Sequence, residues 1–146
     1  MPQLTFPIVS TGLIVPVLIG LDGFTATQLH NAGQRIPPPI SARGILDTGA
    51  DVTCVPAAIL QQLGIATVTT KPAHAISGRY QANMVEISLS IFHPNAPSSD
   101  VFTCSDLFAM ELAHAIHDAD VVVGRDAILQ SQFFIDSPGG HFTLTW

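Results

Sequence analysis

The run Ile45-Leu46-Asp47-Thr48-Gly49-Ala50-Asp51 carries one carboxylate from the end of an apolar segment into a glycine turn. The next residues, Val52-Thr53-Cys54-Val55, are again mostly β-branched or apolar, so we expect one strand to enter the turn and another to leave it. Glycine leaves room for close neighbours, and the Thr48 hydroxyl can both donate and accept hydrogen bonds. The pattern therefore predicts that Asp47 is held rigidly at a strand end.

This run resembles the active-site loop of the retropepsin family, the small aspartic proteases of retroviruses, retroelements and some bacteria. A second segment, Val121-Val122-Val123-Gly124-Arg125-Asp126, resembles the apolar-apolar-Gly-Arg-Asp motif that precedes the last helix of that family. Between the two motifs, residues 71–87 match the family's hairpin flap more loosely, with Ile76-Ser77-Gly78 at the tip. In outline, the resemblance covers residues 12–146.

The resemblance implies a mainly β fold: a retropepsin-like closed β-barrel protomer with two or three short helices, forming a two-fold homodimer. We expect a single domain over residues 1–146, with an insertion at about residues 24–41. In the family, both ends of the chain pair with those of the second subunit. Pro2 and Pro7 fit an edge strand at the beginning of the chain.

Catalysis of this type needs two carboxyls. One takes a proton from water while the other protonates the carbonyl, and two adjacent carboxyls sharing one proton supply both functions. The chain has a single Asp-Thr-Gly, so the second carboxyl has to come from another copy of the chain. We therefore predict a homodimer with Asp47 of each subunit at the axis. The alternative for Asp47 is a strand-end residue in an ordinary Asx turn.

The resemblance also assigns roles to other residues. Thr48 would bind its counterpart across the axis, and Arg125 would pair with Asp51 in a buried brace. The alternative for Arg125 is an exposed residue at the start of a helix. The active-site support is thus expected from Thr48, Gly49, Asp51 and Arg125, and substrate contacts from Gly49, Ala50, Asp51, Ile76, Ser77, Gly78 and Val122.

Composition limits the classes of partner. Of the 146 residues, 47% are hydrophobic and 11% charged, an apolar excess that favours an oligomer. The net charge of −6, with five Lys and Arg, argues against nucleic acid or an anionic membrane as a partner. The apolar run at residues 8–21 contains Gly12 and Pro16, so strands are favoured over a signal or an anchor. With only Cys54 and Cys104, we expect a cytoplasmic protein without disulfides.

Periodicity suggests the other elements. Helices are expected at residues 56–64, 106–117 and 125–130, and an irregular loop at 24–41. Strands are expected at residues 13–21, 65–70, 81–92, 101–104, 121–123, 133–135 and 141–146.

Two other groups suggest chemistry, but a structural explanation is favoured for each. The set His114, His117, Asp118 and Asp120 lacks the glutamate of a zincin motif, so we interpret it as a solvated surface and expect no metal and no cofactor. Cys54 is interpreted as a small buried thiol.

The sequence thus predicts an aspartic endopeptidase that hydrolyses extended polypeptides with water activated by an Asp dyad shared between two subunits. The alternative is a non-catalytic peptide-binding or scaffolding dimer with the same fold.

Overall fold

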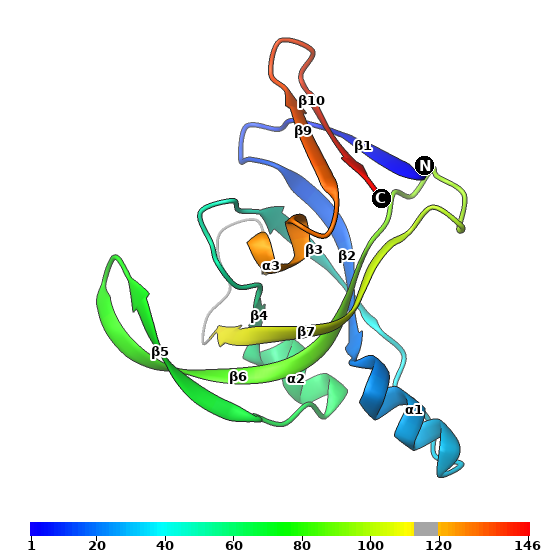
Figure 1. Ribbon diagram of the computed structural model, residues 1–146, viewed down its shortest axis with the longest axis vertical. Coiled ribbons are helices and arrows are strands. Elements are labelled where there is room, and N and C mark those ends of the chain that lie inside the picture. The colour runs from blue at the N-terminus through cyan, green and yellow to red at the C-terminus, as the bar shows by residue number, and fades with distance from the viewer. Residues whose placement is uncertain (113–119) are drawn as a thin grey trace.

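A computed structural model describes residues 1–112 and 120–146 (Figure 1). In chain order, the elements are β1 (Gln3–Pro7), β2 (Ile14–Leu21), α1 (Gly23–Asn31), β3 (Ile40–Leu46), β4 (Cys54–Pro56), α2 (Ala57–Leu63), β5 (Thr69–Ala75), β6 (Gly78–Ile91), β7 (Phe102–Leu112), β8 (Val121–Val123), α3 (Arg125–Ile128), β9 (Gln132–Asp136) and β10 (His141–Thr145).

Most of the strands form a closed barrel. Their order is β2-β3-β8-β4-β7-β6, and β6 pairs back onto β2 to close the ring. Side chains that alternate along each strand fill the interior, because successive residues of a strand point to opposite faces. On β2 the inward residues are Val15, Val17 and Ile19, and on β6 they include Ile87 and Leu89, all 0% exposed. The mainly β fold with a closed barrel and three short helices agrees with the sequence prediction.

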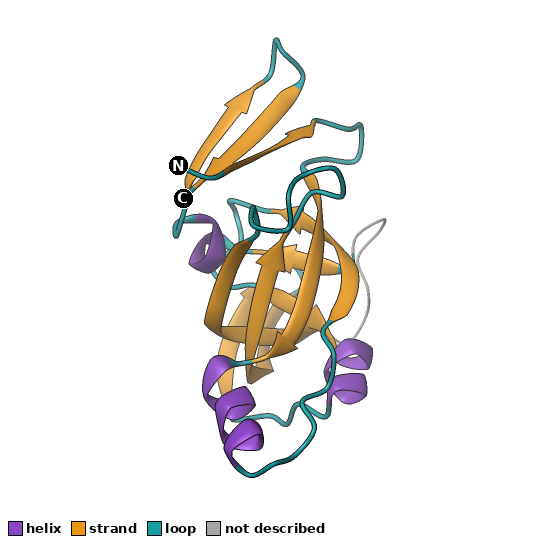
Figure 2. Cartoon of the chain, turned by 90° about the vertical axis from the view of Figure 1, so that its right-hand side faces the viewer, coloured by secondary structure: helices purple, strands orange, loops and turns teal. Residues whose placement is uncertain are grey.

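A separate three-stranded sheet, in the order β1-β10-β9, stands at one end of the barrel (Figure 2). Leu4 and Phe6 of β1 and Phe142 and Leu144 of β10 are buried, and the Phe6 and Phe142 rings stack at 5.4 Å. Here β1 pairs with β10 of its own chain, from Gln3↔Thr145 to Pro7↔His141. The chain ends thus pair within one protomer, and the intersubunit pairing that the resemblance implied stays a prediction. The edge position predicted for β1 is confirmed.

The hairpin β5–β6 extends beyond the barrel (Figure 1). Its register runs from Thr69↔Met84 to Ala75↔Gly78, and Ile76 and Ser77 form the turn. The predicted flap hairpin and its tip are therefore present. The strand predicted at residues 65–70 begins only at Thr69.

The helix predicted at residues 106–117 is wrong over the part that the structure describes, where β7 runs from Phe102 to Leu112. Residues 113–117 lie outside the described part. Leu, Ala, Met and Glu favour a helix locally, but β7 pairs with β6 on one side and with β4 on the other. The pairing of β7 with strands on both of its edges outweighs the weak intrinsic preference of its residues for a helix.

The irregular loop predicted at residues 24–41 is also wrong over residues 24–31, where α1 forms. Asp22 caps the helix by accepting a hydrogen bond from the Thr25 amide at 2.9 Å. The turn signals Asn31-Ala32-Gly33 end the helix, and Gly33 takes a positive φ of 67°. Across residues 1–112 and 120–146, no helix combines the length and apolarity needed to cross a membrane.

Candidate active site

Asp47 directly follows β3, which the barrel fixes in place. Leu46 pairs with Val123 of β8, and the Asp47 amide donates to the Val123 carbonyl at 3.0 Å. The Asp47 side chain is exposed in the single chain, and its Oδ1 accepts the Gly49 amide at 2.8 Å. An ordinary Asx turn makes the same bond, so this contact alone does not separate the catalytic interpretation from that alternative.

The turn after Asp47 is bound to the segment that leads from β8 into α3. The Arg125 amide donates to the Ala50 carbonyl at 2.9 Å, and the Asp126 amide to the Asp51 carbonyl at 3.3 Å. The two backbones approach closely at Gly124, where a Cβ would lie 2.6 Å from the Val52 carbonyl carbon. Only glycine permits this approach, so the sequence motif with Gly124 has a direct steric reason.

Sequence reasoning missed the innermost contact of this junction. Thr53 is 0% exposed, and its amide donates to both carboxylate oxygens of Asp126 at 3.0 Å. The Thr53 hydroxyl donates to Asp126 Oδ1 at 2.7 Å and accepts the Gly124 amide at 3.2 Å. The available signal was a hydroxyl residue within the mostly apolar run 52–55, because a buried hydroxyl needs a partner.

The predicted ion pair between Arg125 and Asp51 is present (Figure 1 shows the two segments at α3 and the β3–β4 loop). The expectation that this pair is buried is wrong for the single chain, because its side chains are 50% and 77% exposed. An exposed pair contributes little to stability. In this protomer the buried brace is Asp126 with Thr53.

A cavity of about 370 Å³ lies between the turn after Asp47 and the β5–β6 hairpin. Three of the predicted substrate-binding residues, Gly49, Ala50 and Asp51, line it. The other lining residues are Val52, Cys54, Lys71, Pro72, Ala73, His74, Tyr80, Met84 and Met110. A concave, mainly apolar space with a few polar groups is the usual form of a binding site.

The remaining predicted residues do not line this cavity. Ile76 is fully exposed at the hairpin tip, beside Ser77 and Gly78, while Val122 is buried in β8. Thr48 is exposed, and its hydroxyl has no partner among the residues that the structure describes. In one protomer, these residues are therefore not brought together with Asp47 into a closed site.

Cys54 is half-buried and lines the cavity, rather than lying in the core as predicted. Burial, and to a smaller extent the negative charges of Asp126 and Asp47, together raise the pKa of its thiol to about 11. A thiol with this pKa remains protonated at neutral pH, so Cys54 is unsuited to act as a nucleophile.

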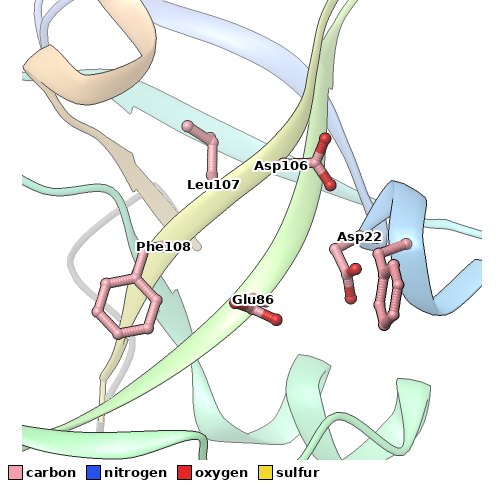
Figure 3. A pocket seen from close by; sticks show the side chains of 6 residues that line it. Asp22, Glu86, Asp106, Leu107 and Phe108 are labelled. Carbon is pink, nitrogen blue, oxygen red and sulfur yellow. The ribbon is translucent and has the colours of Figure 1, made fainter.

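A second cavity, of about 350 Å³, lies between α1 and strands β6 and β7 (Figure 3). Its acidic side chains are Asp22, Glu86 and Asp106, and it shares no lining residue with the cavity beside Asp47. Within the described ranges, no group of three or more His, Cys, Asp or Glu is placed to hold a metal ion. Of the predicted surface set, His114, His117 and Asp118 lie outside the described residues.

Three solved structures are similar in fold. A retropepsin-like aspartic protease from Rickettsia conorii aligns over 97% of this chain and 89% of its own, with a TM-score of 0.55 and 13% identity. The Simian Foamy Virus (mac) protease aligns over 78% of this chain and 91% of its own (TM-score 0.43, 14% identity). The retroviral protease-like domain of Ddi1 from Leishmania major aligns over 91% and 93% (TM-score 0.43, 11% identity). No protein-family model and no curated relative matches the sequence.

The first of these similarities shows that the chain has the retropepsin-like fold. It agrees with the resemblance that the two sequence motifs indicated.

Proposed function

We propose that this chain, with its retropepsin-like fold, is one half of a homodimeric aspartic endopeptidase. The observation that carries the proposal is the placement of Asp47. Its exposed carboxylate stands at the end of a strand fixed by the barrel, beside an apolar cavity that a hairpin covers. That cavity has room for side chains of an extended peptide.

The reaction would use Asp47 of two protomers that share one proton. The ionised carboxylate takes a proton from water as the water oxygen attacks the peptide carbonyl, and the protonated carboxyl gives its proton to the carbonyl oxygen. Collapse of the tetrahedral intermediate breaks the C–N bond, and the leaving nitrogen receives a proton from the dyad. The Gly49 amide, which donates to Asp47 Oδ1, would help to orient the carboxylate.

Other residues would hold the second protomer, the substrate or the turn after Asp47 in place. Thr48, exposed beside Asp47, is free to bind its counterpart in the second protomer. Gly49, Ala50 and Asp51 would contact the substrate, and the tip residues Ile76, Ser77 and Gly78 would close over it from the flap. Val122 would support the pocket from β8, and Arg125 would hold Asp51. We propose a cytoplasmic location, an extended polypeptide as the substrate, and no cofactor.

A mixing experiment tests the shared site. Asp47→Asn chains are refolded in excess with wild-type chains, and cleavage of an unfolded protein is measured. A heterodimer holds one carboxyl and one amide, and the amide can neither accept the proton of the attacking water nor share a proton with the opposite carboxyl. Activity should therefore fall as the square of the wild-type fraction, so that one-tenth wild-type leaves about one-hundredth of the activity.

A linear fall in the mixing experiment would show that each chain acts alone and would contradict the shared dyad. Absence of cleavage by pure wild-type dimers that still bind peptide would instead support the non-catalytic peptide-binding dimer.

A further inference from the structure

The floor of the cavity beside Asp47 is rich in sulfur. Cys54 of β4 pairs with Met110 of β7, which in turn pairs with Met84 of β6. Directly opposite residues on neighbouring strands point to the same face, so these three side chains form one row, and all three line the cavity. Methionine is flexible and polarisable, so this floor can adapt to the aliphatic part of an incoming side chain.

Two polar donors at this cavity lack strong acceptors. The Tyr80 hydroxyl lies 3.3 Å from the Met110 sulfur, and a thioether is only a weak acceptor. The Lys71 side chain lines this cavity, and its ammonium lies 4.7 Å from the centre of the Phe108 ring, which lines the second cavity. Among the described residues, Lys71 has no carboxylate within ion-pairing distance, whereas the cavity's acidic residue, Asp51, is already paired with Arg125.

We propose that this cavity selects a glutamate side chain of the peptide substrate, with Lys71 as the specificity-determining residue. The two methylene groups of glutamate would lie on the Cys54–Met110–Met84 floor, and its carboxylate would accept hydrogen bonds from Lys71 and Tyr80. The inference deepens the proposed function, because it rests on an extended peptide lying in this cleft.

The charge distribution of the chain supports this choice of ligand. The whole protein carries a formal charge of −6, which disfavours acidic substrates in general. The cavity differs, since Lys71 and His74 line it and Asp51 is neutralised by Arg125. Lys71 and Tyr80 are both exposed, so a purely apolar side chain would gain nothing from their donors, whereas a carboxylate would accept charge-assisted hydrogen bonds from them.

The test uses a set of peptides with apolar residues around the scissile bond, in which each position in turn is Glu, Gln or Lys. Cleavage by wild-type protein should show, at one position, a preference for Glu over Gln of about fivefold in kcat/KM. Lys71→Met should abolish this preference, and Lys71→Glu should shift it to Lys. Arg79→Met is the matched control: Arg79 lies on the same hairpin and carries the same charge, but it does not line the cavity, so the preference should remain.

A second measurement separates recognition from catalysis. Fluorescence anisotropy reports binding of the same labelled peptides to Asp47→Asn protein with and without Lys71→Met. Selective, Lys71-dependent binding of the Glu peptide supports the inference even if wild-type protein cleaves nothing, an outcome that would contradict only the proposed catalysis. Equal binding of Glu and Gln peptides, no binding of either, or equal effects of Lys71→Met and Arg79→Met would overturn it.

Discussion

Two neighbouring residues at the start of α3 differ sharply in what they contribute to stability. Asp126 accepts hydrogen bonds from the buried Thr53, whereas Arg125 pairs with Asp51 at the surface. Hydrogen bonds to a charged group stabilise more than neutral ones, and a buried donor left without a partner is costly. The motif therefore joins a residue with a structural role to one whose contact faces solvent.

We predict that Asp126→Ala lowers the free energy of unfolding by about 3 kcal/mol, because the Thr53 amide and hydroxyl would lose their acceptor. Arg125→Ala should lower it by less than about 1 kcal/mol, as expected for an exposed ion pair. Urea unfolding followed by tryptophan fluorescence measures both changes. Losses of equal size would contradict the division of roles between the two residues.

Cys54 provides a prediction about pH. Its thiol pKa is raised to about 11 from a usual value of 9.0, chiefly by burial. At pH 8, iodoacetamide should therefore label Cys54 in the folded protein on the order of a hundredfold more slowly than in the chain unfolded in urea. Labelling followed by mass spectrometry at pH 8 to 11 would show the rate rising with pH, and equal rates in folded and unfolded protein would contradict the prediction.

The same shift in thiol pKa affects stability. The folded-state pKa lies above the unfolded value, so between about pH 9 and 11 the unfolded chain releases a proton that the folded chain retains. The contribution of Cys54 to the free energy of unfolding is constant below about pH 9. The free energy of unfolding then falls as the pH rises from about 9 to 11. Replacing Cys54 by Ser should reduce this alkaline loss, which thermal unfolding across the window would detect.

Among the elements, those with local sequence signals agreed best with prediction. The short strand β8 and the beginning of α3 lie where the apolar run and the Gly-Arg-Asp motif placed them, whereas the β5–β6 hairpin was expected only from the resemblance to the family's flap. For β7 the local signal was misleading. Its buried residues are Phe102 and Cys104, then Leu107 and Ala109, so the alternation changes parity between them. A register shift against β6 causes this change, and the resulting spacing imitates a helix.

The contact between Thr53 and Asp126 could not be predicted from local sequence patterns, for a different reason. The two residues lie 73 positions apart, and only the pairing of β8 with β3 and β4 brings their segments together. Cavity lining is similarly non-local, since Cys54, Met84 and Met110 come from three strands. Sequence motifs identified Asp47, but the surroundings of Asp47 depend on tertiary pairing.

The flap provides a prediction at the scale of an element. Gly78 has a φ of +122° beside the hairpin tip, and a Cβ there would meet no atom within 4 Å. Gly78→Ala would thus impose backbone strain alone, of about 1–3 kcal/mol, at a tip with no buried side chain. The exposed tip can relieve this strain by changing its conformation, so we expect kcat/KM for peptide cleavage to fall about tenfold while the melting temperature falls by no more than a few degrees.

Ser77→Ala serves as the control for Gly78→Ala, because it removes a neighbouring side chain without restricting the backbone. Similar activity losses in the two variants, or a large drop in melting temperature for Gly78→Ala alone, would contradict the proposed role of the tip conformation.

For the whole molecule, part of the apolar excess seen in the composition lies on the surface, at several places along the chain from Phe24 to Ile135. Large apolar side chains are exposed at Leu129, directly after α3, and at Phe134 and Ile135 of β9, with exposures of 77%, 65% and 44%. Covering exposed apolar side chains with a second protein surface favours association. They therefore support the proposed homodimer, in which a second copy supplies the second carboxyl.

The pairing of distant segments also determines when the site can form during folding and synthesis. β3 lies beside β8 through Gly44↔Val121 to Leu46↔Val123, and β1 closes on β10 at the other end of the chain. Contacts between residues far apart in sequence form slowly, because a long loop must first be closed. A nascent chain that has emerged only as far as β7 contains Asp47 but not the segment that braces its turn. The proposed peptidase would thus remain inactive during its own synthesis until the β8–α3 segment has left the ribosome and can brace the turn after Asp47.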